Sequence, residues 1–266
     1  MAPSATSWHA AWVEVALVLV LAGLYAAAAR SYRPSRTRIA AFAGSVSLLL
    51  LVSVTPIATI ALHYLLAAHL VQNVVMAEWA PALAVAGLSA GMAAALARYR
   101  PVRAATHPLV ALFAWLGAYG FWHVPAVYDY ALRHAFALHL EHATYFLAGV
   151  LLWWPVLQDA PRDLSSGARA VYLFAAFVLA SPIGLLLALL PEPVYDYYEE
   201  APRLWGLTPL EDQQLAGGLM LGVDLAVMVG ALVFFFLRTA QDADREEEPG
   251  RPALSAAQRG EGVEIG

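Results

Sequence analysis

Four histidines gather where two long apolar stretches of the sequence meet, between residues 122 and 155. They are His123, His134, His139 and His142. A titratable side chain near hydrocarbon is costly, so such residues usually bind a ligand or carry a proton. His139 and His142 are three residues apart, which places them on one face of a helix. This region therefore predicts metal binding, haem ligation or proton transfer, against the alternative of histidines that only cap helices and fill space.

Three residues outside this region are further candidates. His69 lies deep in an apolar stretch, where an imidazole is hard to solvate. Met220 follows Asp212 by about 12 Å along one helix, which brings its sulfur to the expected depth of His69. Imidazole suits Cu, Zn, Fe and Ni, and an added thioether favours Cu(I). Asp212 fits either the N-terminal cap of its own helix or a carboxylate that hydrogen-bonds a metal-binding imidazole.

The composition excludes several classes of protein. Hydrophobic residues make up 61% of the 266 residues and charged residues only 13%, whereas a soluble domain has about 25% charged residues. Long apolar stretches in such a chain predict an all-α, polytopic membrane protein in contact with lipid. The chain has no cysteine, which excludes disulfides and thiolate metal sites. The net charge of −5 gives no reason to expect a nucleic-acid partner.

Seven transmembrane helices fit the apolar pattern, because a bilayer needs about 20 apolar residues per span. Six are direct, at residues 10–29, 39–57, 107–127, 137–158, 169–190 and 212–237. The stretch 59–97 is long enough to hold two spans and is interrupted by Pro81, which breaks or kinks a helix. We expect one span here, kinked at Pro81, with 80–97 as its inner end.

Arginine placement decides between one span and two. With seven spans and the N-terminus outside, the inner loops carry the arginines of 30–38, 98–103 and 162–169, and only Arg133 and Arg203 stay outside. A second span between 80 and 97 would put the first two of these loops on opposite sides. The positive-inside rule therefore predicts seven spans with a cytoplasmic C-terminus.

This layout gathers seven of the eight histidines on the outer side. His9 and His107 are expected to take no part in the chemistry. Residues 1–240 form the predicted seven-helix transmembrane domain, and the charged, Gly- and Pro-rich residues 241–266 are expected to be a disordered cytoplasmic tail. The acidic, aromatic segment 191–200 is expected to be a solvated loop.

Four short blocks stand in order between residues 10 and 238. They are His69-Leu70-Val71-Gln72-Asn73 with Ala80-Pro81-Ala82-Leu83, Trp122-His123-Val124-Pro125 with Tyr128-Asp129, His139-Leu140-Glu141-His142 with Trp153-Trp154-Pro155, and Asp212-Gln213 with Gly217-Gly218 and Met220. Their order and spacing resemble the CtaG family of membrane proteins, which is linked to the assembly of caa-type cytochrome c oxidase in bacteria.

The resemblance implies a seven-helix protein of the bacterial cell membrane that helps to mature the oxidase, with copper handled on the outer side. It marks six candidates for the metal site: His69, His123, His139, His142 and Met220 as ligands, and Asp212 as the residue that orients one imidazole. The family's third-span motif usually looks like His-Met-x-Gln-His. Here Leu70 and Asn73 stand at the Met and second His positions, so two potential copper ligands are missing.

Two functions of different classes follow. The first is a non-enzymatic assembly factor that binds copper and contacts an oxidase subunit or a copper metallochaperone. The second is an electron-transfer protein in which His69 pairs with His123 or His139 as axial ligands of a haem. A proton or small-ion transporter is a third reading, but the sequence has no internal repeat to support a common transporter architecture.

Overall fold

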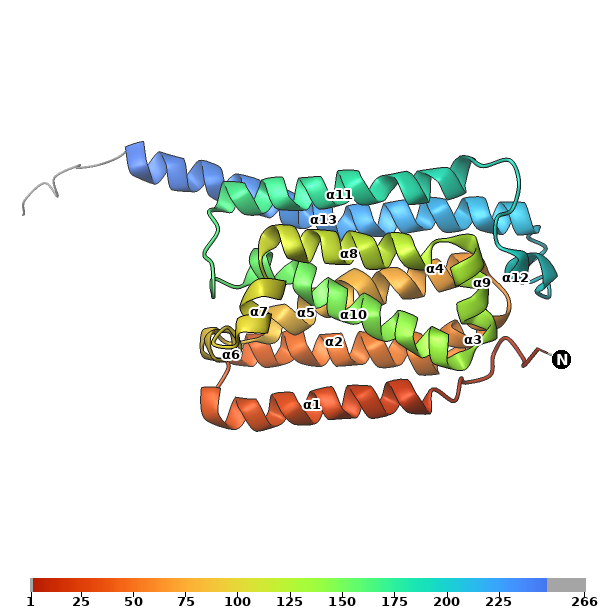
Figure 1. Cartoon of the computed structure of the whole chain (residues 1–266), viewed down its shortest axis with the longest axis horizontal. Helices are drawn as coiled ribbons and strands as arrows, with labels where there is room; N and C mark the ends of the chain where they lie inside the picture. The colour runs from red at the N-terminus through yellow and green to blue at the C-terminus, as the bar shows by residue number, and fades with distance from the viewer. Residues whose placement is uncertain (1, 248–266) are drawn as a thin grey trace, which may run out of the picture.

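Helices are the only regular elements in the residues that the structure describes, 2–247, in a computed structural model of the chain (Figure 1). In chain order they are α1 (Trp12–Tyr32), α2 (Arg36–Val54), α3 (Pro56–His63), α4 (Leu66–Val74), the π-helical turn η1 (Val75–Trp79), α5 (Ala80–Gly87), α6 (Ala90–Leu96), α7 (Arg100–Ala105), α8 (Pro108–Trp122), α9 (Pro125–Arg133), α10 (Ala135–Leu157), α11 (Ser166–Leu189), α12 (Asp196–Glu200) and α13 (Pro209–Glu247). The prediction of an all-α protein is confirmed.

Six helices within the described residues are long and apolar enough to cross a membrane. They are α1, α2, the continuous span Leu66–Gly87, α10, α11 and α13. A seventh span requires α8 and α9 to be taken together, although they are bent by 74°. α8 alone has 15 residues, or about 22 Å at the α-helical rise. The predicted span 107–127 was therefore too long, because Pro125 disfavours a helical conformation at Val124 and the helix ends at Trp122.

The stretch 59–97 holds one span, as the arginines predicted, but its limits differ from those expected. The chain leaves helical geometry at Tyr64 and Leu65, so His63 lies on a separate short helix from His69. A second break follows Gly87, so 80–97 is not one segment.

The irregular turn η1 lies just before Pro81, where the kink was expected. Pro81 has no N–H, so the carbonyl of Ala77 loses its usual α-helical donor. Gly149 of α10 packs onto that carbonyl, and a Cβ at Gly149 would overlap the Ala77 oxygen. The absence of a side chain at Gly149 thus lets α10 approach the disturbed turn closely.

Gly217 serves the same purpose between α13 and α11. A Cβ there would lie 2.5 Å from the carbonyl oxygen of Gly184 and 2.5 Å from the nitrogen of Ala188. Gly218 has nothing within 4 Å of its own Cβ position. Only the first glycine of the pair is therefore required for the close approach of the two helices.

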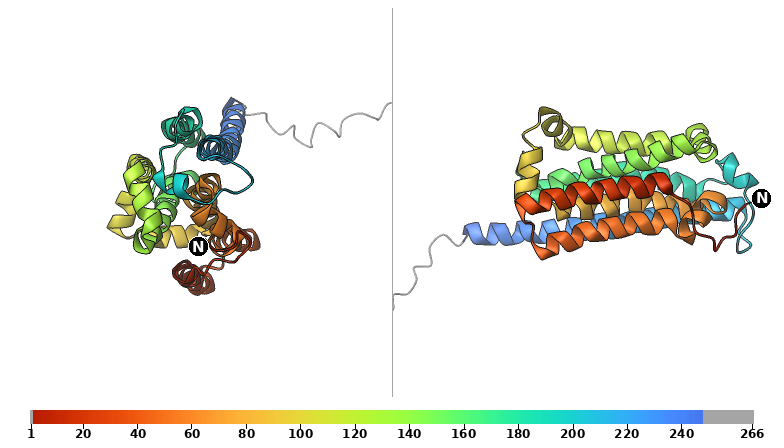
Figure 2. Two further views of the ribbon diagram at one scale, coloured as in Figure 1. Left: turned by 90° about the vertical axis from the view of Figure 1, so that its right-hand side faces the viewer. Right: turned by 90° about the horizontal axis from the view of Figure 1, so that it is seen from below.

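The bundle has two chemically different ends (Figures 1 and 2). The N-terminal segment, α3, α9 and α12 lie at one end, which we call the histidine end because seven of the eight histidines belong to it or to the helix turns beside it. The α1–α2 turn, α6, α7 and the α10–α11 loop lie at the other, the arginine end. The grouping of arginines expected from the positive-inside rule is thus present in the fold.

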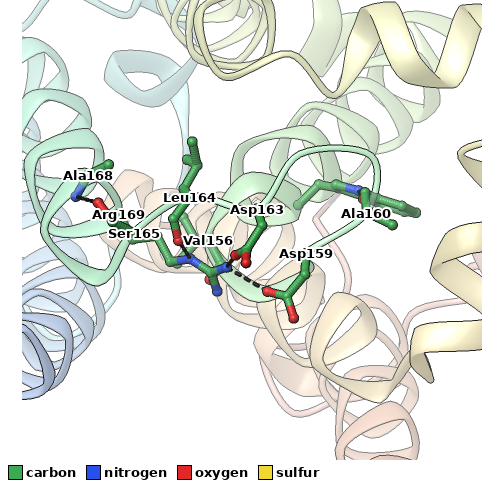
Figure 3. A network of polar contacts seen from close by, with 9 residues as sticks. Val156, Asp159, Ala160, Asp163, Leu164, Ser165, Ala168 and Arg169 are labelled. Atoms are coloured by element: carbon green, nitrogen blue, oxygen red, sulfur yellow. Dashed lines mark hydrogen bonds and ion pairs between the residues drawn. The ribbon is translucent and has the colours of Figure 1, made fainter. Parts of the chain in front are cut away.

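Arg169 fixes the α10–α11 connection at the arginine end (Figure 3). Its guanidinium donates to the carboxylates of Asp159 and Asp163, at 2.6 and 2.9 Å, and to the carbonyl oxygens of Val156 and Leu164, both at 2.9 Å. Val156 belongs to the last turn of α10, whose carbonyls have no helical donor. One buried side chain therefore satisfies the end of α10 and holds the start of α11 against it.

The segment 191–200 is not the solvated loop that we predicted. It forms α12 and the turn before it, and the rings of Tyr195 and Tyr198 are 2% and 3% exposed. Asp129 of α9 accepts hydrogen bonds from the backbone N–H groups of Asp196 and Tyr197, which fixes the start of α12. The acidic residues face outward, and the aromatic ones cover the polar interior of the bundle.

Candidate metal-binding site

Two imidazoles lie near the buried ring of Tyr128 at the histidine end, and a third lies beside one of them. The ring centroid of His69 is 5.3 Å from that of Tyr128 and 6.3 Å from that of His142, and the centroid of His123 is 6.3 Å from that of Tyr128. None of the three histidines is more than 7% exposed. Three of the predicted ligands, from α4, α10 and the end of α8, therefore meet in one buried cluster.

Tyr198 fixes the ring of His69. The Tyr198 hydroxyl donates its only hydrogen to the carbonyl oxygen of Ala61, at 2.5 Å, so it accepts from Nδ1–H of His69, at 2.8 Å. Burial raises the pKa of Tyr198, which keeps the hydroxyl protonated. The tautomer of His69 is thereby set, with its free lone pair on Nε2.

A backbone carbonyl fixes His123 in the same way. Nδ1 of His123 lies 2.7 Å from the carbonyl oxygen of Tyr119, which can only accept, so Nδ1 carries the proton. The hydroxyl of Tyr145 lies 3.3 Å from the same nitrogen, and the hydroxyl of Tyr195 donates to the His123 carbonyl at 3.1 Å. The bend between α8 and α9 is thus held in place around this imidazole.

The Nε2 atoms of His69, His123 and His142 are all buried without a hydrogen-bonding partner. A buried polar atom normally has a partner, so three such nitrogens in one cluster need an explanation. In metal-binding histidines a protein group holds one ring nitrogen, and the other faces the ion. His69 and His123 show this arrangement, whereas both ring nitrogens of His142 are without a hydrogen-bonding partner. The donor atoms present therefore suit a metal that prefers imidazole.

Glu14 is a residue of this cluster that sequence reasoning missed. Its Oε1 accepts from Nδ1 of His139 at 2.6 Å and lies 3.4 Å from Nδ1 of His142. It stands in the first turn of α1, where a carboxylate inside a predicted span was the signal to follow. His139 thus lies beside the three imidazoles but is joined to them through Glu14.

His9 and His63 extend the polar region toward the surface. The backbone N–H of His9 donates to the carbonyl oxygen of Val54, which anchors the N-terminal segment over the end of α2. Burial lowers the pKa of both imidazoles, and this outweighs the opposite effect of Glu14 on His9. Both imidazoles therefore stay neutral at a lower pH than usual, and the neutral form is the one that binds metals.

Met220 lies beside Tyr119 and His123 in the interior of the bundle. Its sulfur accepts a hydrogen bond from the hydroxyl of Tyr119 at 3.4 Å, and the residue is 1% exposed. Met220, His123, Tyr145 and Asn73 line a small void that has no room for a water molecule. Met220 is thus close to His123. The helical rise had predicted only that its sulfur lies at the depth of His69.

Asp212 does not orient an imidazole. Its carboxylate accepts from the backbone N–H groups of Leu66 and Ala67, at 2.7 and 3.0 Å, and so caps the N-terminus of α4. Its own helix is capped by Thr208 and Glu211, whose side chains reciprocally bond each other's N–H groups. Asp212 therefore caps α4 instead of its own helix, and it positions the helix that carries His69.

The geometry fits two imidazoles on one ion better than three. In the part of the chain that the structure describes, no group of three or more His, Asp or Glu side chains is arranged to hold a metal. Metal–nitrogen bonds of about 2.0 Å put the centroids of two imidazoles on one ion roughly 5–6.5 Å apart. The 6.3 Å between His69 and His142 lies within that range.

Comparison with known families supplies the biological setting. The chain matches the family described as cytochrome c oxidase caa3 assembly factor (Caa3_CtaG) over residues 18–242. The chain belongs to this family. The resemblance seen in the four sequence blocks is confirmed. Neither curated proteins nor solved structures match the chain.

This caa3 assembly-factor chain uses the two altered positions of its third-span motif for structure. Leu70 is fully buried in the apolar core. Nδ2 of Asn73 donates to Oε1 of Glu141 at 3.0 Å, and both side chains are buried. The bond ties α4 to α10, so Asn73 helps to hold the helices that carry His69 and His142.

Proposed function

We propose that this caa3 assembly factor is not an enzyme but binds a copper ion as cargo between His69 and His142. The observation that carries the proposal is the set of buried, unpartnered Nε2 atoms, with Nδ1 of each imidazole already engaged or facing a protein oxygen. His123 and Met220 supply further nitrogen and sulfur donors beside this pair, and His139 stands at its approach.

Copper in its reduced state suits this donor set. Cu(I) accepts as few as two ligands and favours imidazole nitrogen and thioether sulfur, whereas divalent ions usually require four or more. A pair of neutral imidazoles with Met220 near by supplies enough ligands for Cu(I) but too few for a divalent ion. The protein's part is to hold the imidazoles in the right tautomer and to keep water out.

The partner in this proposal is an oxidase subunit or a copper metallochaperone, because the family acts on cytochrome c oxidase. We also propose that the chain lies in the bacterial cell membrane with its histidine end outside. The arginine end would then face the cytoplasm, in agreement with the positive-inside rule.

A test in cells separates this function from a structural role. Substitution of His139 and His142 together by Ala is expected to lower oxidase activity strongly. The change removes one of the two proposed copper ligands, His142, and also the more exposed imidazole next to it, His139. The abundance of the protein should not change, since neither imidazole makes a backbone hydrogen bond. Parallel loss of activity and abundance would show that the pair is structural and would contradict the proposal.

The haem alternative gains no support from the geometry. A porphyrin between two histidines needs a slot of its own size, whereas the void beside His123 and Met220 does not admit a water molecule. A Soret band from the purified protein would favour haem over copper.

A further inference from the structure

Four side chains form a continuous line from the surface of the histidine end into the buried cluster. The side chain of His139 is 30% exposed, that of Glu14 12% and that of His142 7%, and His69 is fully buried. Each neighbour in this order is in contact with the next: 2.6 Å, then 3.4 Å between side-chain atoms, then 6.3 Å between ring centroids. The order of contacts is also the order of decreasing exposure.

Glu14 is the link that joins the exposed and the buried members. One carboxylate oxygen, Oε1, lies between the imidazoles of His139 and His142, and the other, Oε2, is buried with no hydrogen-bonding partner. An unsatisfied buried carboxylate oxygen is costly. A cation bound here would satisfy Oε2 and would lie beside His142, whose Nδ1 also has no hydrogen-bonding partner.

A cavity large enough for a cation lies beside the same residues. A cavity of about 230 Å³ is lined by Glu14, His139 and His142, and otherwise mainly by apolar side chains of α1, α2 and α10. Its polar groups all come from the line described above, apart from Ser53. A cation in this cavity therefore has Glu14 as its one carboxylate.

We propose that Glu14 and His139 capture the copper ion and pass it to His142, from which it reaches His69. The inference rests on the proposed function and adds the route by which the cargo arrives. We call Glu14 and His139 the capture pair, and His142 and His69 the buried pair.

Ligand exchange along this line needs no redox step. At each move one metal–ligand bond forms as another breaks: His142 replaces His139 beside Glu14, and His69 then replaces Glu14 beside His142. The copper keeps its charge throughout. The exchange runs downhill, because Cu(I) prefers the two nitrogens of the buried pair to the oxygen and nitrogen of the capture pair. The carboxylate accelerates the first encounter by attracting the cation.

The test is the rate of copper loading, measured separately from its extent. Cu(I) is delivered anaerobically as its cationic acetonitrile complex to the detergent-purified full chain, and the copper still unbound at each time point is measured by the colour it forms with added bathocuproine disulfonate. Glu14→Gln keeps the shape of the side chain but removes its charge, so it is expected to slow loading by about tenfold or more. The final copper content should equal that of the unchanged protein, because the buried pair is intact.

Two further variants make the result specific. Glu14→Asp retains the carboxylate and should load faster than Glu14→Gln, which a purely structural role of this position does not predict. His134→Gln changes an exposed histidine of the same end, stacked on Tyr130 and outside the line, and should load at the unchanged rate.

Each remaining outcome overturns a defined part of the account. Unchanged loading in Glu14→Gln removes the capture role while leaving the proposed function intact. Loss of final copper content in the same variant makes Glu14 part of the holding site and also removes the capture role. A wild-type chain that takes up no copper overturns the proposed function and the route together.

Discussion

Tyr198 decides which nitrogen of His69 is free to bind. Its hydroxyl hydrogen is committed to the carbonyl of Ala61, so the imidazole has to present Nδ1–H to the phenol and Nε2 to the interior. His123 is set by a backbone carbonyl in the same manner. At the scale of single residues, the site is therefore defined by groups that select a tautomer, as much as by the imidazoles themselves.

Removal of the Tyr198 hydroxyl tests this selection. Tyr198→Phe keeps the packing of the ring but leaves Nδ1–H of His69 without its acceptor, so Cu(I) affinity is expected to fall by about 10- to 100-fold. Competition with bathocuproine disulfonate measures the change. Tyr197→Phe is the matched control, because the Tyr197 hydroxyl donates to the Leu62 carbonyl rather than bonding to His69. Equal affinities of the two variants would show that Tyr198 does not orient the ligand.

Sequence alone predicted the histidines of the cluster but not the residues that hold them. His69, His123 and His142 stand out because an imidazole is costly in an apolar stretch. The partners of His69 and His139 stand 129 and 125 residues away in the chain, so no local pattern connects them. Glu14 also lies before residue 18, where the family match begins, so the sequence blocks did not point to it.

Helix ends do most of the positioning at the scale of elements. Asp212 of α13 caps α4 and fixes the turn from which His69 projects, and the break at Tyr64 and Leu65 places α3 apart from it. Gly149 lets α10 approach η1, and so helps to place His142 near His69. A cap or a close approach made by a residue distant in sequence leaves no trace in hydropathy, which is why these features were missed.

Hydropathy predicted the positions of most spans, and proline predicted one of the irregular turns. Six of the seven predicted spans agree with helices that can cross a membrane, and the interruption near Pro81 is present. The remaining span is short because the chain turns at His123. The same turn gives that imidazole its backbone acceptor.

The orientation of these helices stays a prediction with a direct test. The chain has no cysteine, so one introduced thiol reports the side of the membrane on which it lies. A membrane-impermeant maleimide is expected to label Glu200→Cys, at the exposed histidine end, in intact cells. It should label Arg98→Cys, at the exposed arginine end, only after permeabilisation. The reverse pattern would place the histidine cluster on the cytoplasmic side.

The two ends of the molecule differ in what their residues do. The arginine end closes the bundle through contacts such as those of Arg169 with the last turn of α10. The histidine end brings the N-terminal segment, α9 and α12 together over a buried polar cluster (Figure 1). Of the six spans, Leu66–Gly87 is the most buried, since 72% of its apolar 18-residue segment lies inside the protein. This span carries His69 at the centre of the cluster.

The copper content of the purified chain tests the central claim most directly. After Cu(I) loading and removal of unbound metal, the unchanged protein and His134→Gln are expected to hold about one copper ion per chain, whereas His69→Ala and His142→Ala should hold almost none. All four proteins should keep a cooperative thermal unfolding transition above the temperature of the loading experiment, which separates ligand loss from unfolding. Copper retained in His69→Ala and His142→Ala, or absent from the unchanged protein, would contradict the account.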